Sequence, residues 1–310
     1  MSTSRGTLPR PSRSNSPIAV LGGGRGLGSV LRALREDRTP LAVIVSIGYE
    51  DERGGEPRQR VTGASVEDLR RSLEALTDEE GPLLRAIRRP LTVERLGRHP
   101  LGNLLIASAA AAFDDYELAS AWLGDQLGVA GVVLPATVEP VELQIEDGEE
   151  KPSSRSVAFP RLRFAEAYVG SPDAAVAAIE HAQWVVLAPG SLYRSVLSTS
   201  SVPDLATALH RTPAPVLWIA NLEPGSQETA GMSAIDHLLA LRAHSIPVDI
   251  VLHDPSATLR FDPSELAVHG VRSVSRPLRS KRDPAVHDPQ LLRSALRELG
   301  GSRPAGTARG

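Results

Sequence analysis

The sequence contains no cysteine, which excludes a disulfide framework, a thiolate metal site and a cysteine nucleophile. Aromatic residues make up only 4% of the chain, so Leu, Val, Ile and Ala must fill the interior. No apolar run is long enough to span a bilayer, and even the stretch 104–113 is short and rich in alanine. No apolar signal segment follows the N-terminus, so we expect a cytoplasmic protein without a membrane anchor.

The chain also lacks an excess of basic residues, since 34 Lys and Arg stand against 37 Asp and Glu. With a net charge of -3, no overall basic field favours nucleic acid as a partner. The 8 histidines show no metal-ligand spacing, and the motifs H-E-x-x-H and G-x-S-x-G are absent. These absences argue against a metalloenzyme and a serine hydrolase, and we assign no metal-binding residue.

At 310 residues the chain is long enough for one α/β domain with additions. Residues 1–17 are rich in Ser, Arg, Pro and Gly, and we expect this tail and the tail 300–310 to be disordered. Between them, at 18–299, short β-branched runs alternate with helical patterns. This alternation predicts a Rossmann-like three-layer α/β/α fold with a mostly parallel sheet and a small β-rich insertion at about 135–165.

We predict the burial of residues on two of the helices. The predicted helix 101–113 is nearly all apolar, so we expect it to be buried. Asp236 and His237 are neighbours on an amphipathic helix, and we interpret this pair as surface residues rather than a catalytic pair. The main predicted strands are 18–21, 41–47, 129–134, 184–188, 215–220 and 248–252.

A glycine-rich turn, GGGRGLG at 22–28, joins the first predicted strand to the first predicted helix. Glycines let the backbone approach a phosphate closely, and a helix N-terminus presents unpaired N–H groups and the positive end of its dipole. Neither the dinucleotide motif G-x-G-x-x-G nor the P-loop motif fits the spacing, and a tight turn that binds nothing is the alternative interpretation. The candidate phosphate-binding residues of this turn are Gly22, Gly23, Gly24 and Gly26.

Polar residues near the ends of other elements complete the candidate site. Asn103 lies at the start of the apolar helix, where it either caps the helix or contacts a ligand. Gly190 and Ser191 follow a buried strand, and Ser191 again offers a cap or a phosphate donor. Asn221 ends the next strand. If the sheet is parallel, the turns after its strands meet at one edge, which favours a common binding site.

Five motifs follow one another along the chain: LGGGRGL at 21–27, GRHPLGNLL at 97–105, VVLPAT at 132–137, APGSLY at 188–193 and NLEPGSQETAG at 221–231. In this order they resemble the CofD/YvcK family over about residues 18–299. The resemblance is strongest to the YvcK-type gluconeogenesis factors of actinobacteria, which also have a His-Asp-Pro sequence, here His287-Asp288-Pro289, before a last helix.

The resemblance implies one of two functions for the same cleft. YvcK-type members are cytoplasmic proteins that bind UDP-sugars, notably UDP-N-acetylglucosamine, and support growth on gluconeogenic carbon, cell shape and wall synthesis. CofD-type members are enzymes that transfer 2-phospho-L-lactate from a nucleotide-activated donor to the deazaflavin precursor of coenzyme F420, with magnesium. We expect the first function: a nucleotide-sugar-binding regulator rather than an enzyme, acting through a partner protein, with homo-oligomerisation left open.

One departure from the family pattern decides between these functions. Both branches carry an acidic pair after the second strand, whereas this chain has only the displaced substitutes Glu50 and Asp51. Asp68 is the acid that survives before the next helix. Metal-assisted transfer requires carboxylates at strict distances, so the departure argues against catalysis. In the transferase alternative these three acids would hold Mg²⁺, and a family member that only scaffolds is a third hypothesis.

Overall fold

The computed structural model describes residues 16–49, 66–78, 80–90, 100–146, 159–225 and 227–301. Most of the two predicted tails lies outside these ranges. Glu50 and Asp51, two of the three acids of the transferase alternative, lie outside them as well.

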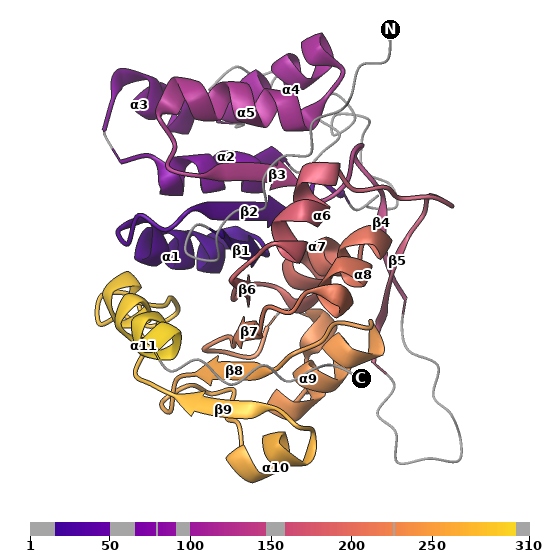
Figure 1. The fold of residues 1–310 in the computed structure, drawn as a ribbon, viewed down its shortest axis with the longest axis vertical. Coiled ribbons are helices and arrows are strands. Elements are labelled where there is room, and N and C mark those ends of the chain that lie inside the picture. The colour runs from indigo at the N-terminus through magenta and orange to yellow at the C-terminus, as the bar shows by residue number, and fades with distance from the viewer. Residues whose placement is uncertain are drawn as a thin grey trace, which may run out of the picture.

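A seven-stranded parallel sheet forms the centre of the molecule (Figure 1). The strand order is β3-β2-β1-β6-β7-β8-β9, and every neighbouring pair is parallel. In this register Ile18 lies opposite both Leu41 and Trp184. The strands are β1 (Ile18–Leu21), β2 (Leu41–Val45), β3 (Val132–Pro135), β6 (Trp184–Leu187), β7 (Val216–Ile219), β8 (Ile250–His253) and β9 (Arg272–Ser275).

Helices cover both faces of this sheet (Figure 1). The side chains of α1, α2 and α11 enter one buried cluster, and those of α6, α8 and α9 enter the other. The described helices are α1 (Gly24–Arg35), α2 (Val66–Leu76), α3 (Pro82–Arg88), α4 (Leu101–Phe113), α5 (Tyr116–Leu127), α6 (Asp173–Glu180), α7 (Ser198–Ser200), α8 (Pro203–Arg211), α9 (Ala234–Ala243), α10 (Pro263–Val268) and α11 (Pro289–Gly301), with a π-helix at Leu192–Leu197.

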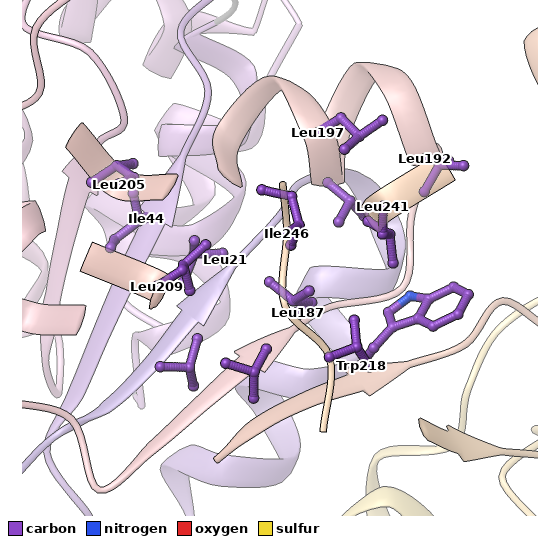
Figure 2. Packing of buried hydrophobic residues seen from close by; sticks show 14 of the residues in the cluster. Leu21, Ile44, Leu187, Leu192, Leu197, Leu205, Leu209, Trp218, Leu241 and Ile246 are labelled. Carbon is purple, nitrogen blue, oxygen red and sulfur yellow. The ribbon is translucent and has the colours of Figure 1, made fainter. Parts of the chain in front are cut away.

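The central strands are apolar at every position because both of their faces are covered. Along β1, Ala19 and Leu21 enter the cluster beneath α8 and α9, whereas Val20 points to the α1 side. Figure 2 shows Leu21 and Leu187 among leucines of the covering helices. The side-chain alternation of a strand thus gives each covering layer its own aliphatic core.

The predicted three-layer fold with a mostly parallel sheet is confirmed. The small β-rich part is an antiparallel pair, β4 (Leu143–Glu146) and β5 (Arg161–Phe164), with Leu143 opposite Phe164. The elements β9 and α10 were not predicted. The alternating polar sequence of β9 lies at the sheet edge, and α10 is only 6 residues long, so neither has a strong apolar pattern.

Two expectations about burial were wrong. Helix α4 packs against α5, α3 and α2 at one side of the molecule, and its buried residues are only Gly102, Asn103, Ile106 and Ala110. Its alanine-rich end therefore contacts solvent. His237 is fully buried instead of lying at the surface, and its Nδ1 contacts the Ser233 carbonyl at 2.8 Å.

Candidate functional site

The strand order reverses between β1 and β6, the two central strands of the sheet. From β1 the chain first adds β2 and β3 on one side, and it later adds β6, β7, β8 and β9 on the other. In open α/β sheets, ligands bind beyond the carboxyl ends of the strands at such a reversal. The glycine turn follows β1 and the turn at 188–191 follows β6, so both lie at this point.

The glycine turn has the backbone geometry that only glycine adopts easily. Gly22 has a φ of 143° and Gly24 a φ of 70°, both in the region that L side chains avoid. A Cβ at Gly22 would also lie 3.2 Å from Ala188 Cβ, whereas a Cβ at Gly24 would meet nothing within 4 Å. Gly24 is therefore open on its outer side, where a ligand could approach the backbone.

The other two glycines make room for neighbouring segments. A Cβ at Gly26 would lie 2.0 Å from the Pro189 carbonyl oxygen, so α1 meets the turn after β6 without space for a side chain. A Cβ at Gly23 would lie 2.1 Å from Asp68 Oδ2 and 3.2 Å from Ser195 Oγ. These contacts bring the turns after β1 and β6 together with the start of α2.

Asn221 joins the turn after β7 to the turn after β6. Its Oδ1 accepts a hydrogen bond from the Gly190 N–H at 2.9 Å, and its Nδ2 donates to the Gly190 carbonyl at 2.8 Å. Ser191 Oγ accepts from the Arg194 N–H at 3.2 Å and caps the π-helix, as one of its two interpretations predicted. The ends of β1, β6 and β7 therefore form one continuous polar edge.

Asp68 faces this edge from α2. Its Oδ1 accepts a hydrogen bond from the Gly24 N–H at 2.9 Å, so a carboxylate stands at the N-terminus of α1, where an anion is favoured. Desolvation raises the pKa of the half-buried Asp68 above its usual range, although the Gly24 hydrogen bond partly opposes the shift. A carboxylate with a raised pKa at a sheet edge is typical of functional sites.

Asn103 lies beside α2 and does not cap α4. The N-cap position of α4 is Pro100, so the capping interpretation is wrong. Asn103 Oδ1 instead accepts a hydrogen bond from Nε of the buried Arg70 at 2.7 Å. A Cβ at Gly102 would lie 2.7 Å from Arg70 Cδ, which explains the glycine before the asparagine. Arg70 was not among the predicted site residues, because a single arginine on a helix carries no distinctive spacing.

A magnesium ion, which the transferase alternative requires, finds few ligands among the described residues. Of the three acids considered, only Asp68 is described. In the described part of the chain, no group of three or more His, Cys, Asp and Glu side chains could hold a metal. Magnesium requires several oxygen ligands in octahedral geometry, so one carboxylate does not make a site.

A cleft of about 530 Å³ begins at the glycine turn. Gly24 and Arg25 line one end, and the cleft continues along α1 between α2 and α3. Asp283 and Val286 form a further wall, and Arg25 donates to Asp283 Oδ2 at 2.8 Å. No helix among the described residues is both long and apolar enough to cross a membrane.

Together the fold and the site define an open, parallel α/β protein with a glycine turn and polar strand ends where the strand order reverses. The family model described as 2-phospho-L-lactate transferase CofD matches residues 18–277. The chain belongs to the CofD family.

Several known proteins are similar to this chain. A Halalkalibacterium halodurans protein named "Gluconeogenesis factor" is 31% identical over 76% of this chain and 77% of its own length. A Deinococcus radiodurans protein named "Putative gluconeogenesis factor" is 29% identical over 95% of this chain. The alignments span 67% of the Deinococcus protein and 51% of a Nostoc relative. A crystal structure of a UPF0052-family protein from Bacillus halodurans has a TM-score of 0.77 at 24% identity, covering 91% of this chain and 99% of that one, which supports the fold.

Proposed function

We propose that this chain is a gluconeogenesis factor of the YvcK type: a cytoplasmic, non-catalytic regulator that binds a UDP-sugar, with UDP-N-acetylglucosamine as the expected ligand. Through a partner protein it would regulate carbon metabolism, cell shape and wall synthesis. The observation that carries the proposal is the junction of three strand ends at the reversal of strand order, where Gly26 touches Pro189 and Asn221 holds Gly190. The relatives named gluconeogenesis factors support the same assignment.

The geometry suggests how a diphosphate would bind. Gly24 is open on its outer side and begins α1, so the positive end of the helix dipole favours an anion there. The Asn221 clamp holds the Gly190 turn rigid beside it. A rigid, preformed site reduces the ordering entropy that a bound ligand would otherwise have to offset.

A thermal-shift screen tests this proposal with UDP, UDP-N-acetylglucosamine, UDP-glucose, GDP and GTP, each with and without Mg²⁺. A ligand at 100 times its dissociation constant adds about 2.7 kcal/mol, which raises the melting temperature by several degrees. We expect UDP-sugars to stabilise the protein regardless of Mg²⁺. Failure of every UDP compound to do so would refute the proposal.

Two glycine variants locate the ligand. Gly24→Asp places a negative side chain in open space at the N-terminus of α1, and should abolish UDP-sugar binding. Gly128→Asp is the matched control, because Gly128 also has a left-handed φ, 62°, and open space around its Cα, but lies at the end of α5. Both variants carry a similar backbone strain of about 1–2 kcal/mol. Unchanged affinity in Gly24→Asp would remove the glycine turn from the site.

The transferase alternative rests on Asp68. A diphosphate beside Gly24 would meet this carboxylate at close range, and like charges repel unless a proton or a cation lies between them. Stabilisation by guanine nucleotides only with Mg²⁺, together with product formation that Asp68→Asn abolishes, would favour the enzyme. Stabilisation by UDP-sugars that does not depend on Mg²⁺ would favour the regulator.

A further inference from the structure

The cleft along α1 is lined by charged side chains that have no role in the proposed nucleotide site. It extends from Gly24 past Gly28 as far as Arg35, between α1, α2 and α3. The chain as a whole has a net charge of -3, so a cluster of arginines here is a local feature. The described lining contains the arginines Arg25, Arg32, Arg35, Arg71 and Arg88 and the acids Glu74, Asp78, Glu80 and Asp283.

Three of these arginines have carboxylate partners that explain their presence. Ion pairs of this kind at the surface hold side chains in place and contribute little to stability. Asp283 and Glu80 belong to the cleft lining, whereas Glu67, the partner of Arg71, lies outside it. The pairs are Arg25 with Asp283 at 2.8 Å, Arg71 with Glu67 at 2.6 Å and Arg88 with Glu80 at 2.7 Å.

Arg35 has a structural role at the end of α2. Its Nη1 donates to the Ala75 carbonyl at 2.9 Å and to the Thr77 carbonyl at 2.7 Å. Arginines commonly satisfy the last carbonyls of a helix in this way. Asp78 lies 3.9 Å away, at the limit of an ion pair. Arg35 is thus held in place, but its charge is only weakly neutralised.

Arg32 differs from the other four arginines. No described residue gives its side chain a hydrogen bond or an ion pair, and the residue is accessible to solvent. Its guanidinium folds back along the helix, because a Cβ at Gly28 would lie 3.4 Å from Arg32 Nη1. It therefore lies beside Gly28, about one turn nearer the N-terminal end of α1 than Arg32 itself. No acidic residue lies within α1 to offset it.

The titration of Arg32 agrees with this geometry. Desolvation by the surrounding walls lowers the pKa of its guanidinium, and the charges of Arg35 and Arg88 lower it further. The charges of Arg35 and Arg88 therefore repel the guanidinium of Arg32. An anion between them would remove that repulsion, and the planar fork of arginine matches phosphate oxygens well.

We propose that this cleft is a second anion site, anchored by Arg32, which binds the phosphoryl group of a small phosphorylated metabolite. The volume of about 530 Å³ accommodates a molecule of sugar-phosphate size. The site adjoins the proposed nucleotide site at Gly24, but it uses guanidinium groups along α1 rather than the strand ends. It gives the protein a means of sensing a metabolite separately from its nucleotide ligand.

Calorimetric titration of the full chain with glucose 6-phosphate and with inorganic phosphate tests the site. We expect glucose 6-phosphate to bind and Arg32→Gln to weaken that binding at least tenfold, with far-UV circular dichroism unchanged. Arg272→Gln is the control, because Arg272 is an exposed arginine on the edge strand β9. It should bind as the unmodified protein does.

Three results would overturn the inference. The first is unaltered glucose 6-phosphate binding in Arg32→Gln, or no binding to the unmodified protein. The second is inorganic phosphate binding as tightly as the sugar phosphate, which would make free phosphate the occupant. The third is displacement by saturating UDP-N-acetylglucosamine, which would place the phosphoryl group in the nucleotide site. Because UDP-sugar binding is measured separately, failure of one site is distinguishable from failure of the other.

Discussion

Asp68 and Asp254 lie near the same edge of the sheet, yet their surroundings affect them in opposite directions. Asp68 accepts from one backbone N–H, that of Gly24, and desolvation raises its pKa. Asp254, just after β8, also experiences desolvation, but hydrogen bonds from Ser256 and from the N–H groups of Leu278 and Arg279 outweigh it and lower its pKa. Asp254 thus organises a loop, whereas Asp68 accepts a hydrogen bond from a single N–H group among the described residues.

The Asp254 region is a closed structural unit. The Ser256 N–H and Oγ each donate to Asp254 Oδ1 at 2.6 Å, and Oδ2 accepts at 2.5 Å from Leu278 and 2.8 Å from Arg279. These bonds hold the segment that carries His287 over the end of β7. The glycine-turn region instead combines left-handed glycines with an acid whose one hydrogen-bond donor within the described ranges is the Gly24 N–H. Backbone strain is thus concentrated where the proposed ligand binds.

The largest expected effect is a difference in the free energy of unfolding between alanine variants of Asp254 and Asp68. Asp254→Ala leaves several backbone and side-chain donors without an acceptor and should lower the free energy of unfolding by about 4 kcal/mol. Urea denaturation at pH 7 measures the loss. Asp68→Ala, which removes the acceptor of one backbone N–H, is the control and should lose much less. Equal losses would mean that the two carboxylates are equally structural.

Gly26→Ala tests the junction of the two turns. Its Cβ would lie 2.0 Å from the Pro189 carbonyl oxygen, so the backbone must shift, and we expect a loss of about 3 kcal/mol. Gly28→Ala, two residues further along α1, meets only the flexible end of Arg32 and should gain up to about 1 kcal/mol in helix propensity. Thermal denaturation of both variants gives the comparison. A tolerated Gly26→Ala would disprove the close contact.

The next effect is a loss of stability at acidic pH that arises from His287, in the segment that Asp254 holds. Burial lowers the pKa of His287 to about 4 from an ordinary value of 6.5, so the folded protein keeps this ring neutral. Its stabilising contribution is present above pH 6.5 and is lost as the pH falls toward 4, because the unfolded chain takes up the proton first. We expect a loss of roughly 2 kcal/mol over that range, measured by urea denaturation.

His287→Gln should flatten this part of the pH profile. His181→Gln, at the exposed end of α6, is the control and should leave the profile unchanged. A profile that is equally steep in His287→Gln would assign the acid sensitivity to other groups. Asp254 is the main alternative, since its lowered pKa also makes stability fall as the pH falls.

The smallest expected effect is a gain in stability rather than a loss. Asp68→Asn keeps an oxygen that accepts from the Gly24 N–H but removes the charge that is costly to desolvate. Because the pKa of Asp68 is raised in the folded protein, ionisation of this carboxyl group opposes folding. The free energy of unfolding of the unmodified protein therefore falls as the pH rises from the ordinary pKa of an aspartate through the raised pKa of Asp68. We expect the variant to gain about 1 kcal/mol at pH 7 and no gain at a pH low enough to protonate Asp68. Destabilisation at pH 7 would mean that the charge serves the fold.

Much of the fold could be predicted from local patterns. The helix Leu101–Phe113 was predicted with its observed limits, and the apolar runs of β1, β2 and β6 identified the buried strands. Apolar composition was a poorer guide to burial in α4, because alanine-rich sequence suits an exposed helix as well as a buried one. Helix α1 contains three arginines and no acidic residue. This local pattern could have predicted the cationic side of the cleft.

The sequence by itself determined the alternation of strands and helices, the glycine turn and the polar residues at the strand ends, because these features depend on neighbours within a few positions. Only the tertiary structure decided which groups meet. Asp68 reaches Gly24 across 44 positions of sequence, and Asn221 clamps Gly190 across 31. Such contacts depend on sheet order and helix packing, which place distant segments side by side. They decide which carboxylate accepts several hydrogen bonds and which arginine has no partner among the described residues.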